Sequence, residues 1–416
     1  MRLLTSHHLL AAVLALGGCA GQGAAGVGGA GTGGATAGAG GGGGTGGDGG
    51  LTVGSGGGGG GETCDPGLPS VDDDLDGFSE AQGDCNDCDP NANPHAIEVQ
   101  THGGDEPADE DCDGETDELP MPCDEGLALD SLDALEAARA IGLCELYDAD
   151  RGWGLISVAY VNADGTPGVP GLNVGLLPRF GDFNLPLEGA TMLALSSGHA
   201  RDATQPDACG QLSCTTTGPG VAPAGYPQSI PGCTSASDIF DDIALEVELR
   251  APSNALSLSV DLSFFTWEFP EYVCAGFNDQ FVAMADPAPM GAIDGNVAFD
   301  EQLHPVSVNL GLLDHCYPDA IAFYASKCSP PCPAPPMPYC PAGPAIFQGT
   351  DFEDSIGAGG ATGWLQTVVP VEPSGDLRMR FAIWDTGDAA LDSTVLIDRL
   401  RWSATPATVT TTPSPL

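Results

Sequence analysis

Three stretches of the chain alternate between apolar and polar residues with a period of two, the pattern of half-buried β-strands. The clearest covers 256–264, where Leu, Val and Phe alternate with Ser and Asp. The stretches 243–249 and 377–383 repeat this alternation. Further strands are predicted from shorter apolar runs at 155–161, 281–285, 306–313, 320–325, 364–371 and 394–402.

One short helix is predicted over 130–141, where Asp130 or Ser131 offers an N-cap and Gly142 ends the pattern. Its apolar face would hold Leu132, Leu135 and Ala138. The strands that follow are joined by Pro- and Gly-rich loops without intervening helices. We therefore expect a mainly β protein, with a β-sandwich or jelly roll over 124–402.

The first residues carry an export signal rather than part of the fold. A brief apolar run ends in Leu16-Gly17-Gly18-Cys19, which resembles the lipobox of bacterial lipoproteins. The resemblance implies a signal peptide over 1–18, lipidation of Cys19 and, because Ala20 follows, delivery to the outer membrane. An ordinary signal peptide with a chance cysteine is the alternative. Residues 19–61 are rich in Gly and predict a flexible tether.

The composition of the chain limits the kinds of partner that it can bind and the compartment that it suits. Acidic residues outnumber basic ones 58 to 11, for a formal charge of −47, so nucleic acid is excluded as a partner and divalent cations are favoured. The 15 cysteines suit an oxidising compartment and predict several disulfides. If Cys19 carries lipid, the remaining number is even, but the spacing does not determine which cysteines pair.

The segment 62–123 is acidic, but its carboxylates follow a pattern. Asp72-x-Asp74-x-Asp76-Gly77 places three carboxylates on alternate residues before a glycine, as in calcium-binding loops, and Asp109-x-Asp111-x-Asp113-Gly114 repeats the pattern. Asp84 lies one place beyond the closing position of an EF-hand, so a strict EF-hand is not expected. The predicted ligands are Asp72, Asp74, Asp76, Phe78 through its carbonyl, Asp84, Asp87, Asp89, Asp109, Asp111, Asp113, Asp117 and Glu118.

This order of residues resembles the metal-binding motif common in bacterial surface proteins, and also thrombospondin type 3 and dockerin calcium loops. The resemblance covers Asp72 to Glu118 and implies Ca²⁺ as the ligand. The sequence departs from the family at Glu98, which is followed by Val99 and Gln100, so the central ligands match less closely. A metal-free acidic linker and a zinc site at Cys85, Cys88 and Cys112 are the alternatives.

The large domain shows a second set of motifs. They include Gly189-x-x-Met192, Glu268-Phe269-Pro270-Glu271-Tyr272 and Phe277-Asn278-Asp279-x-Phe281, and near the end Asp385-x-x-Asp388-x-x-x-Asp392-Ser393. In this order they resemble the choice-of-anchor L domain, a family of bacterial extracellular domains attached by varied means. The resemblance implies an extracellular location and carries no established activity. Residues 403–416 are expected to form a disordered tail.

The acidic residues of these motifs are candidates for a second metal or ligand site, with loop anchoring as the alternative. They are Asp385, Asp388, Asp392, Glu268, Glu271, Asn278 and Asp279. Ser197 and His199 are near each other in sequence, but no G-x-S-x-G motif accompanies them. We therefore expect a lipid-anchored, calcium-binding structural or adhesive module without catalytic activity, whose partner is an extracellular polysaccharide or another surface protein. A surface hydrolase acting on an extracellular polymer is the alternative.

Overall fold

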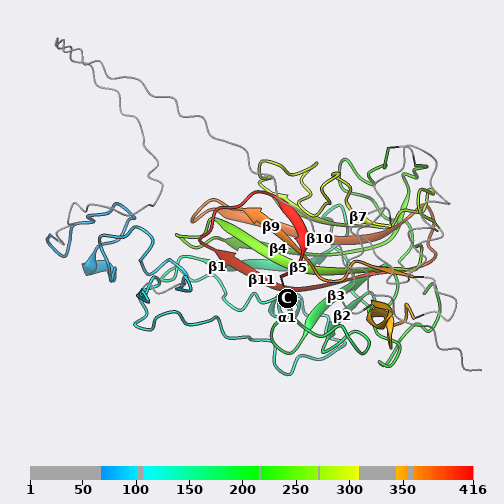
Figure 1. The fold of residues 1–416 in the computed structure, drawn as a ribbon, viewed down its shortest axis with the longest axis horizontal. Helices are drawn as coiled ribbons and strands as arrows, with labels where there is room; N and C mark the ends of the chain where they lie inside the picture. The colour runs from blue at the N-terminus through cyan, green and yellow to red at the C-terminus, as the bar shows by residue number, and fades with distance from the viewer. Residues whose placement is uncertain are drawn as a thin grey trace, which may run out of the picture. The chain divides into compact units, whose positions relative to one another are not determined.

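The computed structural model describes residues 67–101, 106–214, 217–231, 233–269, 272–308, 343–353 and 359–415. The predicted signal peptide, Cys19, the tether, Glu271 and the apolar run 320–325 lie outside these residues. Within them the chain is mainly β and forms two antiparallel sheets, as expected (Figure 1). No helix in the described part of the chain is long and apolar enough to cross a membrane.

The first sheet contains five strands in the order β1-β4-β10-β6-β7. Their bounds are β1 Gly154–Val161, β4 Ile239–Arg250, β10 Asp376–Thr386, β6 Gln280–Asp286 and β7 Val306–Ser307. Outward-facing positions carry opposite charges on neighbouring strands: Arg380 lies opposite Glu246, and their side chains approach to 2.6 Å. Such cross-strand pairs favour the observed register.

The second sheet contains seven strands, six of them in the order β12-β9-β5-β11-β3-β2, with β8 also paired to β5. Their bounds are β12 Thr410–Pro413, β9 Leu365–Pro370, β5 Ser257–Thr266, β11 Ser393–Ser403, β3 Met192–Ser196, β2 Val174–Leu177 and β8 Gly360–Ala361. All three alternating stretches are strands, as predicted. The shorter runs near 155, 281, 306, 364 and 394 also contain strands.

The main apolar core lies between the sheets and confirms the sandwich. It combines Val247 of β4 and Phe381 of β10 with Val260 of β5 and Ile397 of β11, each no more than 1% exposed. A second apolar cluster includes Phe265 of β5 together with residues of η2 (Gly343–Phe347). The side chains on both faces of β2 and β3 are therefore buried. Such strands lack the alternation of apolar and polar residues from which strands are predicted.

The helix is shorter than predicted. α1 covers Ala134–Ala140, and the Asp133 carboxylate caps it by accepting a 2.9 Å hydrogen bond from the Leu135 N–H. Neither Asp130 nor Ser131 is therefore the N-cap, and Leu132 is 48% exposed instead of facing the core. Gly142 follows the helix with φ +94°, as a glycine at a helix C-terminus commonly does.

The expectation of a disordered tail over 403–416 was wrong for the described residues. β12 pairs with β9 at the sheet edge, and the Thr411 hydroxyl lies 2.9 Å from that of Thr367. Ser414 is 2% exposed and donates to Asp261. Threonine is β-branched and suits a strand, and Pro413 is tolerated because the strand lies at an edge.

The acidic segment is hydrogen-bonded to the sandwich at the turn between β4 and β5. Asn254 accepts from the Ile97 N–H at 2.9 Å and donates to the Ile97 carbonyl at 2.8 Å. The Ser253 N–H donates to the His95 carbonyl at 2.8 Å. A Cβ at Gly152 would lie 2.3 Å from His95 Nδ1, so only glycine allows this approach. Residues 91–97 therefore attach the acidic segment to the β domain.

Candidate functional site

The first acidic loop curls its backbone around its own carboxylates. Asp72 accepts from the Leu75 N–H at 2.7 Å and from the Gly77 N–H at 3.1 Å. Leu75 and Gly77 both have positive φ, at 71° and 104°, and glycine is the residue that adopts such a conformation without strain. As a result, one carboxylate oxygen from each of Asp72, Asp74 and Asp76 lies within 4.8 Å of the other two.

Two buried carboxylates complete this first group. Asp84 and Asp87 are 4% and 3% exposed, and together with Asp74 they form a second set of three oxygens within 4.8 Å. Asp84 Oδ1 accepts from the Asn86 N–H at 2.8 Å, whereas Asp84 Oδ2 is buried and has no hydrogen-bond partner among the described residues. Asp74 thus belongs to both sets and links five carboxylates into one group.

The electrostatics of the first group favour a cation. Burial, together with the charges of Asp76, Asp84 and Asp87, raises the pKa of Asp74 to about 6. Burial and neighbouring carboxylates also raise the pKa of Asp84. A cation held among these oxygens would relieve the repulsion that raises both pKa values.

The second loop repeats the conformation of the first. Asp109 accepts from the N–H groups of Asp113 and Gly114, both at 3.1 Å. Cys112 and Gly114 have φ of 60° and 96°, matching Leu75 and Gly77 of the first loop. Asp109, Asp111 and Asp113 again bring one oxygen each within 4.8 Å of the others.

Glu98 and Glu118 close the second group, since both lie with Asp111 inside the same 4.8 Å limit. Glu98 also orders the loop by accepting from the Glu110 N–H at 2.9 Å and the Asp117 N–H at 2.7 Å. Burial, followed by the charge of Asp113, raises the pKa of Asp111 to about 6. Glu98 was not among the predicted ligands, because it lies outside the repeated D-x-D pattern.

Two predicted ligands belong to neither group. Asp89 accepts from the backbone and side chain of Asn91, at 3.1 and 2.8 Å, and Asp117 accepts from the Thr101 N–H at 2.6 Å. Both carboxylates stabilise turns of the described chain rather than joining the clustered oxygens. The Phe78 N–H donates a 2.8 Å hydrogen bond to the Asp76 carboxylate, and the Phe78 ring packs edge-on against His95. That the Phe78 carbonyl binds the metal stays a prediction.

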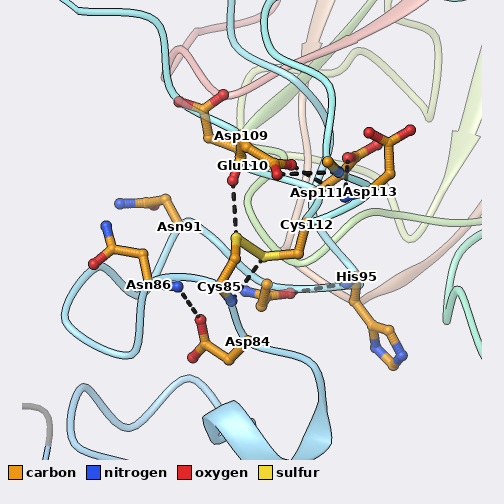
Figure 2. The surroundings of a disulfide bond; sticks show 12 residues. Asp84, Cys85, Asn86, Asn91, His95, Asp109, Glu110, Asp111, Cys112 and Asp113 are labelled. Carbon is orange, nitrogen blue, oxygen red and sulfur yellow. Dashed lines mark hydrogen bonds between the residues drawn. A yellow bond between two sulfur atoms is a disulfide. The ribbon is translucent and has the colours of Figure 1, made fainter.

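A disulfide joins the two loops. Cys85 follows Asp84, Cys112 lies between Asp111 and Asp113, and the two cysteines are bonded to each other (Figure 2). Cys88 is disulfide-bonded as well. The zinc alternative is therefore wrong for this oxidised protein. Zinc is bound by cysteine thiolates, and the sulfurs of Cys85, Cys88 and Cys112 are in disulfides. Three more disulfides, Cys123–Cys144, Cys209–Cys214 and Cys233–Cys274, confirm the prediction of several.

The candidate residues of the β domain divide into two sets. Glu268, Asn278, Asp279, Asp385 and Asp392 are buried, whereas Asp388 is exposed. Ser197 and His199 do not hydrogen-bond to each other: the Ser197 hydroxyl donates to the Ser393 carbonyl at 3.3 Å, and His199 Nδ1 lies 2.8 Å from the Asp207 carbonyl.

Comparison with family models, with curated proteins and with solved structures found no match to this chain. The resemblances to the choice-of-anchor L domain and to calcium-loop motifs therefore stay predictions from the sequence.

Proposed function

We propose that the acidic segment binds Ca²⁺ at two places. The first is formed by Asp72, Asp74, Asp76, Asp84 and Asp87, and the second by Asp109, Asp111, Asp113, Glu98 and Glu118. The observation that carries this proposal is Asp84, which is 4% exposed, has one oxygen without a partner among the described residues, and lies within 4.8 Å of oxygens of Asp74 and Asp87. A buried carboxylate in such surroundings is costly unless a cation accompanies it.

The donor set favours Ca²⁺ over other metals. All the clustered atoms are carboxylate oxygens, which suit hard cations, and the sulfurs nearby are oxidised. Ca²⁺ accepts six to eight oxygens in flexible geometry, whereas Mg²⁺ requires a near-ideal octahedron and retains several waters. Two groups of five carboxylates each match the first requirement better than the second.

The role proposed for the whole chain is a lipid-anchored surface module. The lipobox-like Leu16-Gly17-Gly18-Cys19 supports attachment to the outer membrane through a lipid on Cys19. The segment between that anchor and the sandwich would be held in a defined conformation by Ca²⁺, so that the β domain is presented to an extracellular polysaccharide or another surface protein. A glycan array probed with the full chain tests the adhesive part of this proposal.

Calorimetric titration of the chelator-treated chain with Ca²⁺ and with Mg²⁺ tests the metal sites. Asp74→Ala should weaken binding at the first site and Asp111→Ala at the second, each by at least about tenfold, since each residue belongs to two overlapping groups of oxygens. Asp89→Ala is the matched control, because Asp89 is acidic and lies in the same segment but outside the clusters. No heat of Ca²⁺ binding, or an equal loss with Asp89→Ala, would contradict the proposal.

A further inference from the structure

A second group of buried carboxyl side chains lies in the β domain, where strands of both sheets meet. Glu268 follows β5 and Asp392 precedes β11, and these strands pair at Thr266 and Ser393. Asp279 precedes β6, and Asp385 lies in β10, which pairs with β6. All four carboxyl residues are at most 5% exposed.

Hydrogen bonds from the Thr386 N–H at 2.9 Å and the Ser393 hydroxyl at 2.6 Å connect both sheets to Asp279. The pairing of β4 with β10 also shifts register between Ile383 and Asp385, and such an irregularity can redirect a side chain. Tertiary structure therefore brings together carboxyl groups from two distant parts of the sequence, 268–279 and 385–392.

The hydrogen bonds of this group are incomplete. Asp279 is satisfied at both oxygens, and Asp392 Oδ2 accepts from the Cys214 N–H at 2.8 Å. Both oxygens of Asp385 and Oδ1 of Asp392 have no hydrogen-bond partner within the described part of the chain. Buried polar atoms in folded proteins almost always have a partner, so three such oxygens on two interacting carboxylates indicate a missing ligand.

The charges of this group are also unbalanced. Across the described ranges, no Arg or His forms an ion pair with Glu268, Asp279, Asp385 or Asp392. Burial and the charge of Asp279 hold the pKa of Asp385 well above its usual range. The Ser197 hydroxyl lies near enough to Asp385 to lower its pKa in part, but the hydrogen bond with good geometry that it donates goes to the Ser393 carbonyl at 3.3 Å.

We propose that Asp385 and Asp392 bind a Ca²⁺ ion at this end of the sandwich, with Glu268 and Asp279 contributing negative charge beside it. The three oxygens without partners supply the first ligands, and backbone carbonyls or water complete the shell. Gly198 leaves the space that the Asp392 carboxylate occupies. A Cβ at residue 198 would lie 1.8 Å from Asp392 Oδ2, so only glycine is tolerated there.

The atoms around Asp385 and Asp392 favour a hard cation. The Sγ atoms of Cys209 and Cys214 lie within 4.8 Å of an Asp392 oxygen, but they are bonded to each other, which leaves only hard oxygen ligands. No three of the four carboxylates bring their oxygens within 4.8 Å of one another, although all four residues are described, so only Asp385 and Asp392 are assigned as ligands. Ca²⁺ accepts flexible coordination completed by carbonyls or water, whereas Mg²⁺ requires a near-ideal octahedron.

The test counts bound Ca²⁺ in the full chain after chelator treatment, by equilibrium dialysis. Asp74→Ala with Asp111→Ala serves as the background, because it weakens the sites proposed for the acidic segment. At a free Ca²⁺ concentration too low to fill those weakened sites, this background should still bind one Ca²⁺ per chain, and adding Asp385→Asn should abolish that binding. Asp398→Asn is the matched control: Asp398 is also buried, but the N–H groups of Leu187 and Arg399 satisfy its carboxylate.

Thermal unfolding keeps the proposal testable if a variant folds poorly. Ca²⁺ should raise the unfolding midpoint of the background chain. Asp385→Asn, which removes a buried charge at nearly constant size, should be at least as stable in chelator and should lose the response to Ca²⁺. A background chain that binds no Ca²⁺ and does not respond to it would overturn the proposal, leaving protons to neutralise the cluster. Retention of the ion by Asp385→Asn would overturn it equally. Neither outcome bears on the acidic segment, whose own variants test it separately.

Discussion

The attachment of the acidic segment to the sandwich rests largely on one side chain, Asn254, and replacing it with alanine should release the segment. Asn254 is 3% exposed and makes three hydrogen bonds, two with Ile97 and one, at 3.3 Å, with the Asn91 carbonyl. At about 1 kcal/mol each, their loss should favour opening by about 3 kcal/mol. That is about a hundredfold in the opening equilibrium.

Hydrogen exchange of the residue 253 amide reports this opening, because that N–H donates to the His95 carbonyl across the contact. In Asn254→Ala its protection should fall about a hundredfold. Ser253→Ala is the control, since it removes only the 2.7 Å bond from its hydroxyl to Asn93, for about a fivefold effect. Equal exchange in the wild-type chain and in Asn254→Ala would refute the reasoning, and equal effects of the two variants would show that Asn254 has no special role.

Ca²⁺ binding to the acidic segment should weaken as the pH falls through about 6, because Asp74 and Asp111 then hold protons that the ion must displace. Calorimetry at about pH 7 and about pH 5 measures the affinity, and an unchanged affinity would contradict the prediction. Phe381→Ala should lower the free energy of unfolding by about 3–5 kcal/mol in denaturant titrations, because Phe381 is fully buried between the sheets. Arg378→Ala is the control: the Arg378 side chain is 44% exposed, and its loss should lower the free energy of unfolding by less than about 1 kcal/mol. Equal losses of stability in the two variants would argue against the described core. Cys19→Ala should move the protein from the membrane fraction to the soluble fraction, and retention through a salt wash would refute the lipid anchor.

Several features were predictable because they depend on neighbouring residues alone. The alternation over 243–249, 256–264 and 377–383 marks strands whose apolar face packs in the core, although β5 also buries its polar residues Asp261 and Ser263. The D-x-D-x-D-G pattern marks each loop of clustered carboxylates. Strand β12 was missed for the opposite reason. Its polar threonines have little tendency to form an isolated strand, and they are ordered only because β9 offers a free edge.

The sequence by itself determined the local chemistry: a mainly β chain, cysteines that form disulfides, and two loops whose aspartates face a common centre. Only the tertiary structure decided which distant groups meet there. Asp84, Asp87 and Glu118 were predicted as ligands, but their assignment to one group or the other, and the presence of Glu98 in the second group, come from the structure. Asp385 and Asp392 are likewise placed beside Asp279 by strand pairing. The reason is physical: spacing along a chain sets contacts within a turn or strand, whereas contacts between segments depend on how the sheets pack and bury them.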